Sequence, residues 1–282
     1  MNEHSKENYE VIKVFNNNVI LVKQGEVEKV LYERGLGFGK HTGDTIDSST
    51  RVDKIFSIED KNNSNNFLQM ASNVDNSLIA LCEEIIYMIS KELGEELNEK
   101  IHISLTDHIA FTIKRLQSGD EIQNPFLVET QTLYKREFGL AEKAVRILEK
   151  NLNITIPDGE IGFIALHIHS ARNEGNLSNT IKYAFLSNSI TELVEDELGI
   201  SINRESLDYA RFLTHIRFAI ERIMNNNPIK NELLISIKRK YKKSYAIAKK
   251  AAKIIESELS KEVVDDEIGY IAIHIERFRN MD

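Results

Sequence analysis

One stretch of this chain occurs twice, and that internal duplication constrains the fold more than any other feature. EIGFIALHIHS and EIGYIAIHIER align His167 with His274, 107 residues later. A second pair of stretches, HIAFTIKR and HIRFAIER, separates His108 and His215 by the same distance. Two independent stretches with one offset indicate a duplicated domain of about a hundred residues, which is far longer than a solenoid repeat.

The apolar residues of both copies recur at spacings of three and four, which is the period of an amphipathic helix. Ser104 or Thr106 is expected to cap one helix, and Pro157 suits the first turn of another. The copies therefore predict two all-α helical-bundle domains, residues 67–172 and 178–282. The expected helices lie at about 76–93, 104–116, 125–151, 157–170, 180–198, 204–224, 230–259 and 266–279.

Residues 9–58 differ from the rest, because short β-branched stretches alternate there with turn residues. YEVIKVF, NVILVK, EKVLYER and VDKIFSI predict about four strands of an antiparallel sheet, which forms a domain within residues 1–60. So short a module buries a thin core, and we expect it to need a partner, most simply a second copy. Two polar stretches, 57–66 and 171–179, are expected to be linkers. The predicted fold class is multidomain α+β, with the small sheet domain preceding the two duplicated helical domains.

Composition limits the class of protein further. Apolar and charged fractions of 41% and 28% are typical of a soluble globular chain. Cys82 is the only cysteine, the N-terminus lacks the apolar core of a signal peptide, and no apolar run could span a bilayer. These features predict a cytoplasmic protein without membrane insertion. The net charge of −8 means that any nucleic acid must be bound through shape and local contacts.

The duplicated histidines admit several kinds of site. A histidine on an apolar helix face is commonly a satisfied core residue, yet structure alone rarely repeats a titratable pair in both copies. His167 and His169 point to different helix faces and cannot chelate a metal together, and Asp107 has no acidic counterpart in the second copy. No motif for nucleophilic hydrolysis or phosphate cradling is present, so we expect no enzyme activity, catalytic residue, metal or cofactor. Acceptance of a phosphoryl group is the kind of site that remains for these histidines, because a neutral imidazole nitrogen is nucleophilic near neutral pH.

Two sets of basic residues each admit more than one interpretation. Arg115 and Arg222 follow His108 and His215 by seven residues, two helical turns along one face. They could pair with a phosphate, hold the unmodified site, or simply mark a solvated helix end. The basic run KRKYKKSYAIAKK, residues 238–250, could bind nucleic acid or an acidic partner, but its apolar stripe favours a solvated helix face.

Several motifs together resemble a known family. KVFNNNVILV followed by RGLGFGKHTGD resembles the CAT (co-antiterminator) RNA-binding domain, and the histidine copies resemble phosphotransferase-system (PTS) regulation domains. The chain therefore resembles a BglG/LicT-type transcriptional antiterminator. The residues of its glycine-rich loop are similar to those of the glucose-responsive branch. The resemblance implies a homodimeric regulator that binds an RNA hairpin in a leader transcript and lets transcription of a sugar operon continue. A DNA-binding activator with the same regulation domains is the alternative.

The resemblance also implies site residues. Asparagine can read base edges, phenylalanine can stack on an unpaired base, and lysine and arginine can meet phosphate. Phe38 could instead plug the small core, and Glu33 stands where the family commonly has a small residue, so that it could repel RNA. The implied RNA-binding positions are Lys13, Asn18, Arg34, Gly35, Gly37 and Phe38. The implied phosphorylation sites are His108 and His167, served by a sugar permease, and His215 and His274, served by the phosphocarrier protein HPr.

Overall fold

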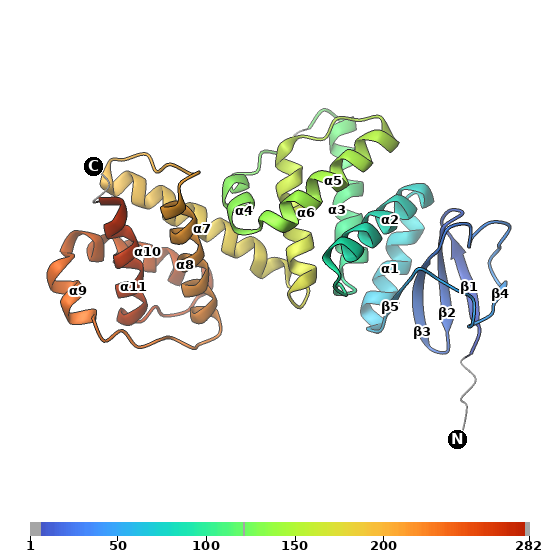
Figure 1. Cartoon of the computed structure of the whole chain (residues 1–282), viewed down its shortest axis with the longest axis horizontal. Coiled ribbons are helices and arrows are strands. Elements are labelled where there is room, and N and C mark those ends of the chain that lie inside the picture. The colour runs from blue at the N-terminus through green and yellow to red at the C-terminus, as the bar shows by residue number, and fades with distance from the viewer. Residues whose placement is uncertain (1–6, 121, 280–282) are drawn as a thin grey trace, which may run out of the picture. The chain divides into compact units, whose positions relative to one another are not determined.

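The structure of the protein, a computed structural model, describes residues 7–120 and 122–279. In this part of the chain, a five-stranded sheet precedes eleven helices, which confirms the predicted α+β class (Figure 1). The chain divides into two compact units. The first contains Met1–Gln123 and Arg136–Leu177, and the second contains Asn124–Lys135 and Ser178–Asp282.

The sheet is antiparallel throughout, with the order β4-β1-β2-β3-β5. Its strands are β1 (Tyr9–Val14), β2 (Val19–Gln24), β3 (Val27–Tyr32), β4 (Thr45–Ile46) and β5 (Lys54–Ile58). Four of the five match the expected strands. The additional strand β4 has only two residues, which is too short for an alternating pattern to be visible in the sequence.

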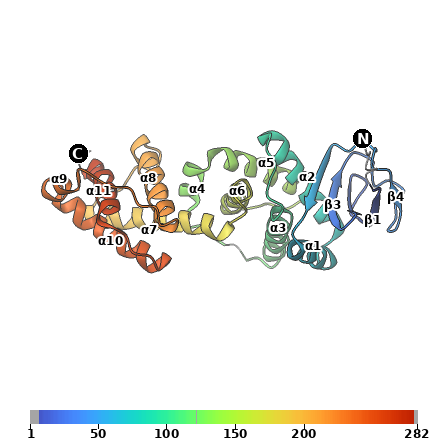
Figure 2. The same ribbon diagram turned by 90° about the horizontal axis from the view of Figure 1, so that it is seen from below.

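Both faces of the sheet are buried. On one face, strand residues such as Val11, Ile20 and Leu31 form a cluster that Leu36 and Val52 of the loops complete. Because side chains alternate along a strand, Val19 and Leu21 point to the opposite face, and both are fully buried. Helices α1 and α2 pack against that face (Figure 2). Helices of the same chain therefore cover one face of the thin sheet, and its expected pairing with a second copy stays a prediction.

The expected linker at residues 57–66 was wrong, because it contains the end of β5 and the first half of helix α1 (Lys61–Asn73). The Asp60 carboxylate caps this helix by accepting hydrogen bonds from the backbone N–H groups of Asn62 and Asn63. Only the second half of α1 is apolar, and Phe67 and Met70 are its buried contacts. The polar first turns conceal the helix in the sequence.

The other helices of the first unit largely follow their predicted positions. The third one begins earlier than expected, so Ser104 and Thr106 lie inside it and do not cap it. These helices are α2 (Asn76–Leu93), α3 (Ile101–Gln117), α5 (Lys135–Leu152) and α6 (Asp158–Arg172). Pro157, expected in the first turn of the last one, is its N-cap residue.

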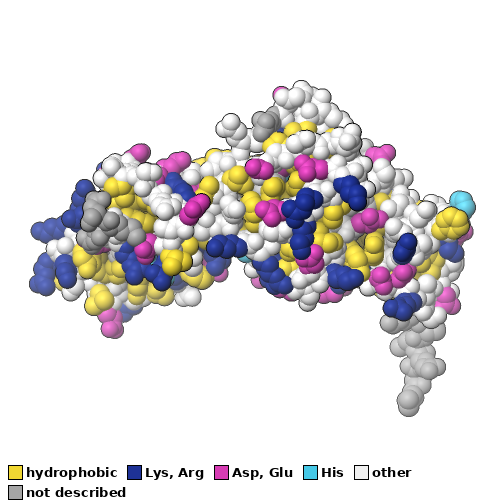
Figure 3. Space-filling view, turned by 45° about the horizontal axis from the view of Figure 1, so that its top comes forward, with side chains coloured by type: hydrophobic (Ala, Val, Ile, Leu, Met, Phe, Trp, Pro, Cys, Tyr) yellow, Lys and Arg dark blue, Asp and Glu magenta, His cyan; other side chains and the backbone are white. Residues whose placement is uncertain are grey.

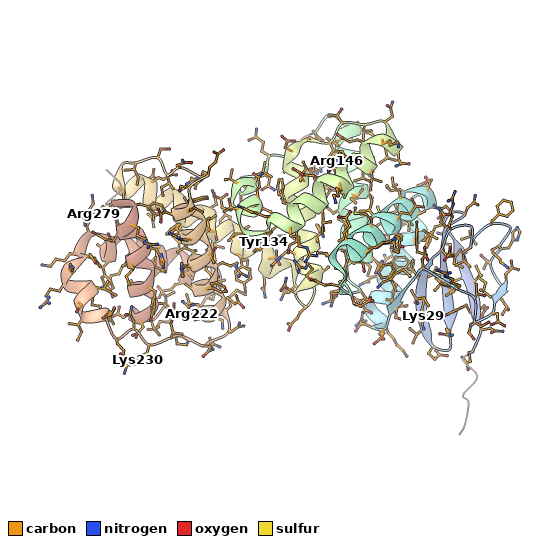
Figure 4. All side chains as sticks on the ribbon, in the orientation of Figure 1. Lys29, Tyr134, Arg146, Arg222, Lys230 and Arg279 are labelled. Carbon is orange, nitrogen blue, oxygen red and sulfur yellow. The ribbon has the colours of Figure 1, made fainter. Side chains whose placement is uncertain are left out.

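The second unit repeats this plan, and two of the expected long helices are broken. The breaks fall at Tyr134 and Tyr241, which have similar non-helical backbone angles and are 107 residues apart (Figure 4). Each tyrosine N–H still donates to the carbonyl four residues earlier, so the apolar pattern continues across the break. The helices of this unit are α4 (Leu127–Leu133), α7 (Leu177–Leu198), α8 (Leu207–Met224), α9 (Leu234–Lys240), α10 (Lys242–Leu259) and α11 (Asp265–Arg279).

Candidate functional sites

The turn after β1 and the glycine-rich loop after β3 are tied together by hydrogen bonds. The side-chain oxygen of Asn18 accepts from the N–H of Gly35 at 3.1 Å, and its carbonyl accepts from the N–H of Glu33 at 3.0 Å. Gly37 N–H donates to the carbonyl of Asn17 at 2.9 Å. Three of the six predicted RNA-binding residues, namely Asn18, Gly35 and Gly37, are thus brought into one loop pair.

Two glycines in this loop are required by geometry. Gly35 has φ +80°, a left-handed conformation that residues with a Cβ rarely adopt. Gly37 has an ordinary φ, but a Cβ there would overlap the carbonyl oxygen of Asn16 and press on Val14 and Ile20. The close approach of the two loops therefore depends on the absence of a side chain at residue 37.

The remaining predicted RNA-binding side chains take different positions. Phe38 is 76% exposed, so it does not plug the core of the sheet, and Arg34 is exposed too. The register of β1 against β2 shifts between Val11 and Lys13, and this bulge turns Lys13 toward the face covered by α1. There the Lys13 ammonium donates to the backbone carbonyl of Ala71.

The first histidine pair lies between α3 and α6. The rings of His108 and His167 are 4.9 Å apart, and His108 Nε2 is 3.1 Å from an oxygen of Glu160. Arg115 donates to the other oxygen of Glu160 at 2.7 Å, and Thr112 donates to the first at 3.0 Å. A single buried carboxylate therefore organises a histidine, an arginine and a threonine.

Protonation at this site follows from burial and hydrogen bonding. Burial, with His108 nearby, lowers the pKa of His167 to about 3, so its imidazole is neutral at physiological pH. Its Nδ1 lies 3.3 Å from the hydroxyl oxygen of Ser104. For Glu160, burial would raise the pKa, but hydrogen bonds from His108 and Arg115 outweigh it and lower the pKa to about 2.

The second histidine pair lies between α8 and α11. The rings of His215 and His274 stack with centroids 4.0 Å apart, and burial lowers the pKa of both, that of His274 to about 4. Arg222, labelled in Figure 4, donates to both oxygens of Glu267 at 2.7 and 2.5 Å. The pair opens on a pocket of ≈ 380 Å³ lined by His215, His274, Arg222, Ile229 and Tyr270, among others.

Glu160 and Glu267 are the site residues whose role the sequence did not reveal. Each begins one copy of the repeated EIG stretch, so the signal was present as a repeated acidic residue. Their contacts exclude one interpretation of Arg115 and Arg222. Both arginines pair with a buried carboxylate, so neither marks a merely solvated helix end, and pairing with a phosphate stays a prediction.

The two copies differ around these carboxylates. In the second unit, the loop before α9 covers the site, because the N–H groups of Ile229 and Asn231 donate to Glu267 and Asp266. The corresponding helix of the first copy, α4, belongs to the second unit and packs against α8. There the hydroxyl of Tyr209 donates to the buried carboxylate of Glu129.

In residues 7–120 and 122–279, no three His, Cys, Asp or Glu side chains are grouped as metal ligands would be. No helix within those ranges is long and apolar enough to cross a membrane. Basic side chains gather at the α9–α10 end of the second unit (Figure 3), and Lys238 there pairs with Asp265.

The fold combines a small sheet domain that carries a glycine-rich loop with two helical domains that each hold a histidine pair. This combination defines one class of regulatory protein. The family model described as "CAT RNA binding domain" matches residues 9–65, and the "PRD domain" model matches residues 83–171 and 188–278. The chain belongs to the family of LicT/GlcT/BglG-type antiterminators, which combine these domains.

Particular relatives resemble the chain over nearly its whole length. Transcription antiterminator LicT of Bacillus subtilis (strain 168) is 38% identical over 95% of this chain and 98% of that protein. The PtsGHI operon antiterminator of the same organism is 40% identical over 96% and 98%. A solved structure, "Crystal structure of GlcT CAT-PRDI", is 42% identical, with a TM-score of 0.52 over 59% of this chain and 99% of that one.

Proposed function

We propose that this protein is an RNA-binding transcriptional antiterminator of a sugar-transport or sugar-utilisation operon, controlled by phosphorylation of its histidines. The observation that carries the proposal is the loop pair of the sheet domain. There Asn18, the left-handed Gly35, Gly37 without room for a side chain and the exposed Phe38 lie together in a domain that matches the CAT RNA-binding family. The names of the relatives, which include a transcription antiterminator and a beta-glucoside operon antiterminator, support the same assignment.

Each side chain of the loop pair has a suitable role on an RNA hairpin. The Asn18 amide can read a base edge, and Phe38 can stack on a base that is not paired. Lys13 and Arg34 can neutralise phosphates, which compensates locally for the net negative charge of the chain. We expect two sheet domains to clamp one hairpin as a homodimer.

The histidines His108, His167, His215 and His274 are the proposed phosphoryl acceptors. A neutral imidazole nitrogen attacks the phosphorus of a phosphorylated PTS protein, either the permease or HPr. The bond from phosphorus to the donor side chain breaks as the new one forms, and the acceptor ring gives up its N–H proton. At His108 the phosphate would add about −1.5 to −2 charges beside the Glu160 carboxylate. That repulsion would separate His108 from Glu160 and release Arg115 to pair with the phosphate.

Selection of RNA tests the nucleic-acid assignment. The full chain is incubated with a library of RNA hairpins that carry randomised internal loops, and the enriched hairpin is then competed against duplex DNA of equal charge. We expect the hairpin to win by several orders of magnitude. Equal competition by duplex DNA would instead favour a DNA-binding activator. The described residues before α1 form a sheet and contain no helix-turn-helix, which argues against that alternative.

Histidine substitution tests the regulatory assignment. Replacing both His108 and His167 by alanine should make antitermination in a reporter strain independent of the sugar. A double variant that still responds normally to the sugar would remove the assignment. Phosphate mapping by mass spectrometry, after incubation with a phosphotransferase system with and without sugar, identifies which of the four histidines are used.

A further inference from the structure

The face of the sheet that carries the proposed RNA contacts is occupied by helices of the regulation domain. The side-chain amides of Asn16 and Asn18 both donate to the same carboxylate oxygen of Glu84, at 3.1 and 3.2 Å. Lys13, on the same face, donates to the carbonyl of Ala71. A charged acceptor makes stronger hydrogen bonds than a neutral one, so Glu84 on α2 is an effective competitor for these amides.

Aromatic contacts close the rest of this face. Phe15 meets Phe67 of α1 edge to face, with ring centroids 6.1 Å apart. Tyr32 of β3 stacks on Tyr87 of α2 at 4.1 Å. Tyr87 lies three residues after Glu84, which places the stacked ring and the carboxylate on neighbouring positions of one helix face.

We propose that this arrangement is a closed, autoinhibited state of RNA binding, and that Glu84 is the residue that holds it closed. The proposal rests on the proposed function of Lys13 and Asn18. The N–H that Asn18 donates to Glu84 is not available to a base, and an ammonium bonded to Ala71 is withdrawn from phosphate. A second sheet domain is also excluded from a face that α1 and α2 cover. RNA binding must therefore open this contact, and the apparent affinity falls by the fraction of molecules that are open.

The closed face is connected to the helix that carries the first phosphorylation site. Glu83, the neighbour of Glu84, forms a buried hydrogen bond at 2.7 Å with Nδ1 of His102 on α3. The His102 ring packs against Phe56 of the sheet, with centroids 4.7 Å apart. Helix α3 also carries His108, so a change in how α3 packs on α6 acts on a helix that contacts both Glu83 and the sheet.

Substitution of Glu84 in the full chain tests the closed state. We expect Glu84→Ala to bind the selected RNA hairpin about tenfold more tightly than the wild type, the factor that corresponds to ~1.4 kcal/mol. Glu84→Gln keeps an acceptor without the charge and should give a smaller gain. Glu92→Ala is the matched control, because Glu92 lies on the same helix but pairs with Lys143, and its affinity should equal that of the wild type.

A second readout reports opening without RNA. Acylation of Lys13 by a succinimidyl ester, followed by mass spectrometry, should be faster in Glu84→Ala than in the wild type and in Glu92→Ala. If Glu84→Ala binds the hairpin within twofold of the wild type and its Lys13 reactivity is unchanged, the proposal is overturned. If the alanine variant does not fold, the same two measurements are made on Glu84→Gln.

The double variant Asn18→Ala with Glu84→Ala separates the two proposals. If it binds the hairpin as well as Glu84→Ala alone, the RNA-contacting role of Asn18 is wrong, and the closed-state proposal falls with it. If it loses binding while Glu84→Ala alone is no tighter than the wild type, the RNA-contacting role stands and only the closed state is refuted.

Discussion

Replacing Glu160 by glutamine removes the charge around which the first histidine site is built. The carboxylate is 2% exposed, pairs with Arg115 and lies 3.1 Å from His108. Its pKa of about 2 lies well below the usual 4.5, a difference that corresponds to about 3 kcal/mol at 1.36 kcal/mol for each pH unit. Because the folded-state pKa is lowered, this stabilisation is present above pH 4.5 and is lost as the pH falls through 2.

Hydrogen exchange measured by mass spectrometry can localise this effect. At pH 7, Glu160→Gln should reduce the protection of α3 and α6 peptides by about a hundredfold, because ~3 kcal/mol corresponds to two powers of ten. The unfolding free energies of Glu160→Gln and of the wild type should become equal as the pH approaches 2. Asp107→Asn, an exposed change on α3, is the control and should leave protection unchanged. Protection of α6 within threefold of the wild type would refute the central role of this carboxylate.

Three further predictions follow from the same structure. The pKa of His167 is about 3 when folded and about 6.5 when unfolded, so its contribution to stability is complete above pH 6.5 and falls as the pH drops toward 3. Urea unfolding at several pH values should show that His167→Gln lacks this part of the pH dependence. Phe38→Ala should weaken binding of the selected hairpin about 10- to 100-fold, as expected for one base stacked on an aromatic ring. Its melting temperature should not change, because the ring is 76% exposed. Gly37→Ala should lower the unfolding free energy of the sheet domain by about 1–3 kcal/mol, because the new Cβ overlaps the Asn16 carbonyl. Urea unfolding measures this loss, and binding of the hairpin is measured in parallel.

Local patterns account for what could be predicted about the fold. Strands with alternating apolar residues and helices with a period near 3.6 were placed correctly where the pattern was long, as in α2 and α6. The failures have local causes. Helix α1 begins in a polar, asparagine-rich stretch whose first buried residue is Phe67, and the breaks at Tyr134 and Tyr241 leave the apolar spacing intact.

The sequence by itself determined the duplication, the four paired histidines and the glycine-rich loop, because repetition and spacing are properties of the chain alone. Only the tertiary structure decided which carboxylate each arginine meets and which surface covers the sheet. Arg115 and Glu160 are 45 residues apart, and Asn18 and Glu84 are 66 apart. Contacts over such separations depend on how whole helices and strands pack together, and no local pattern of residues records that packing.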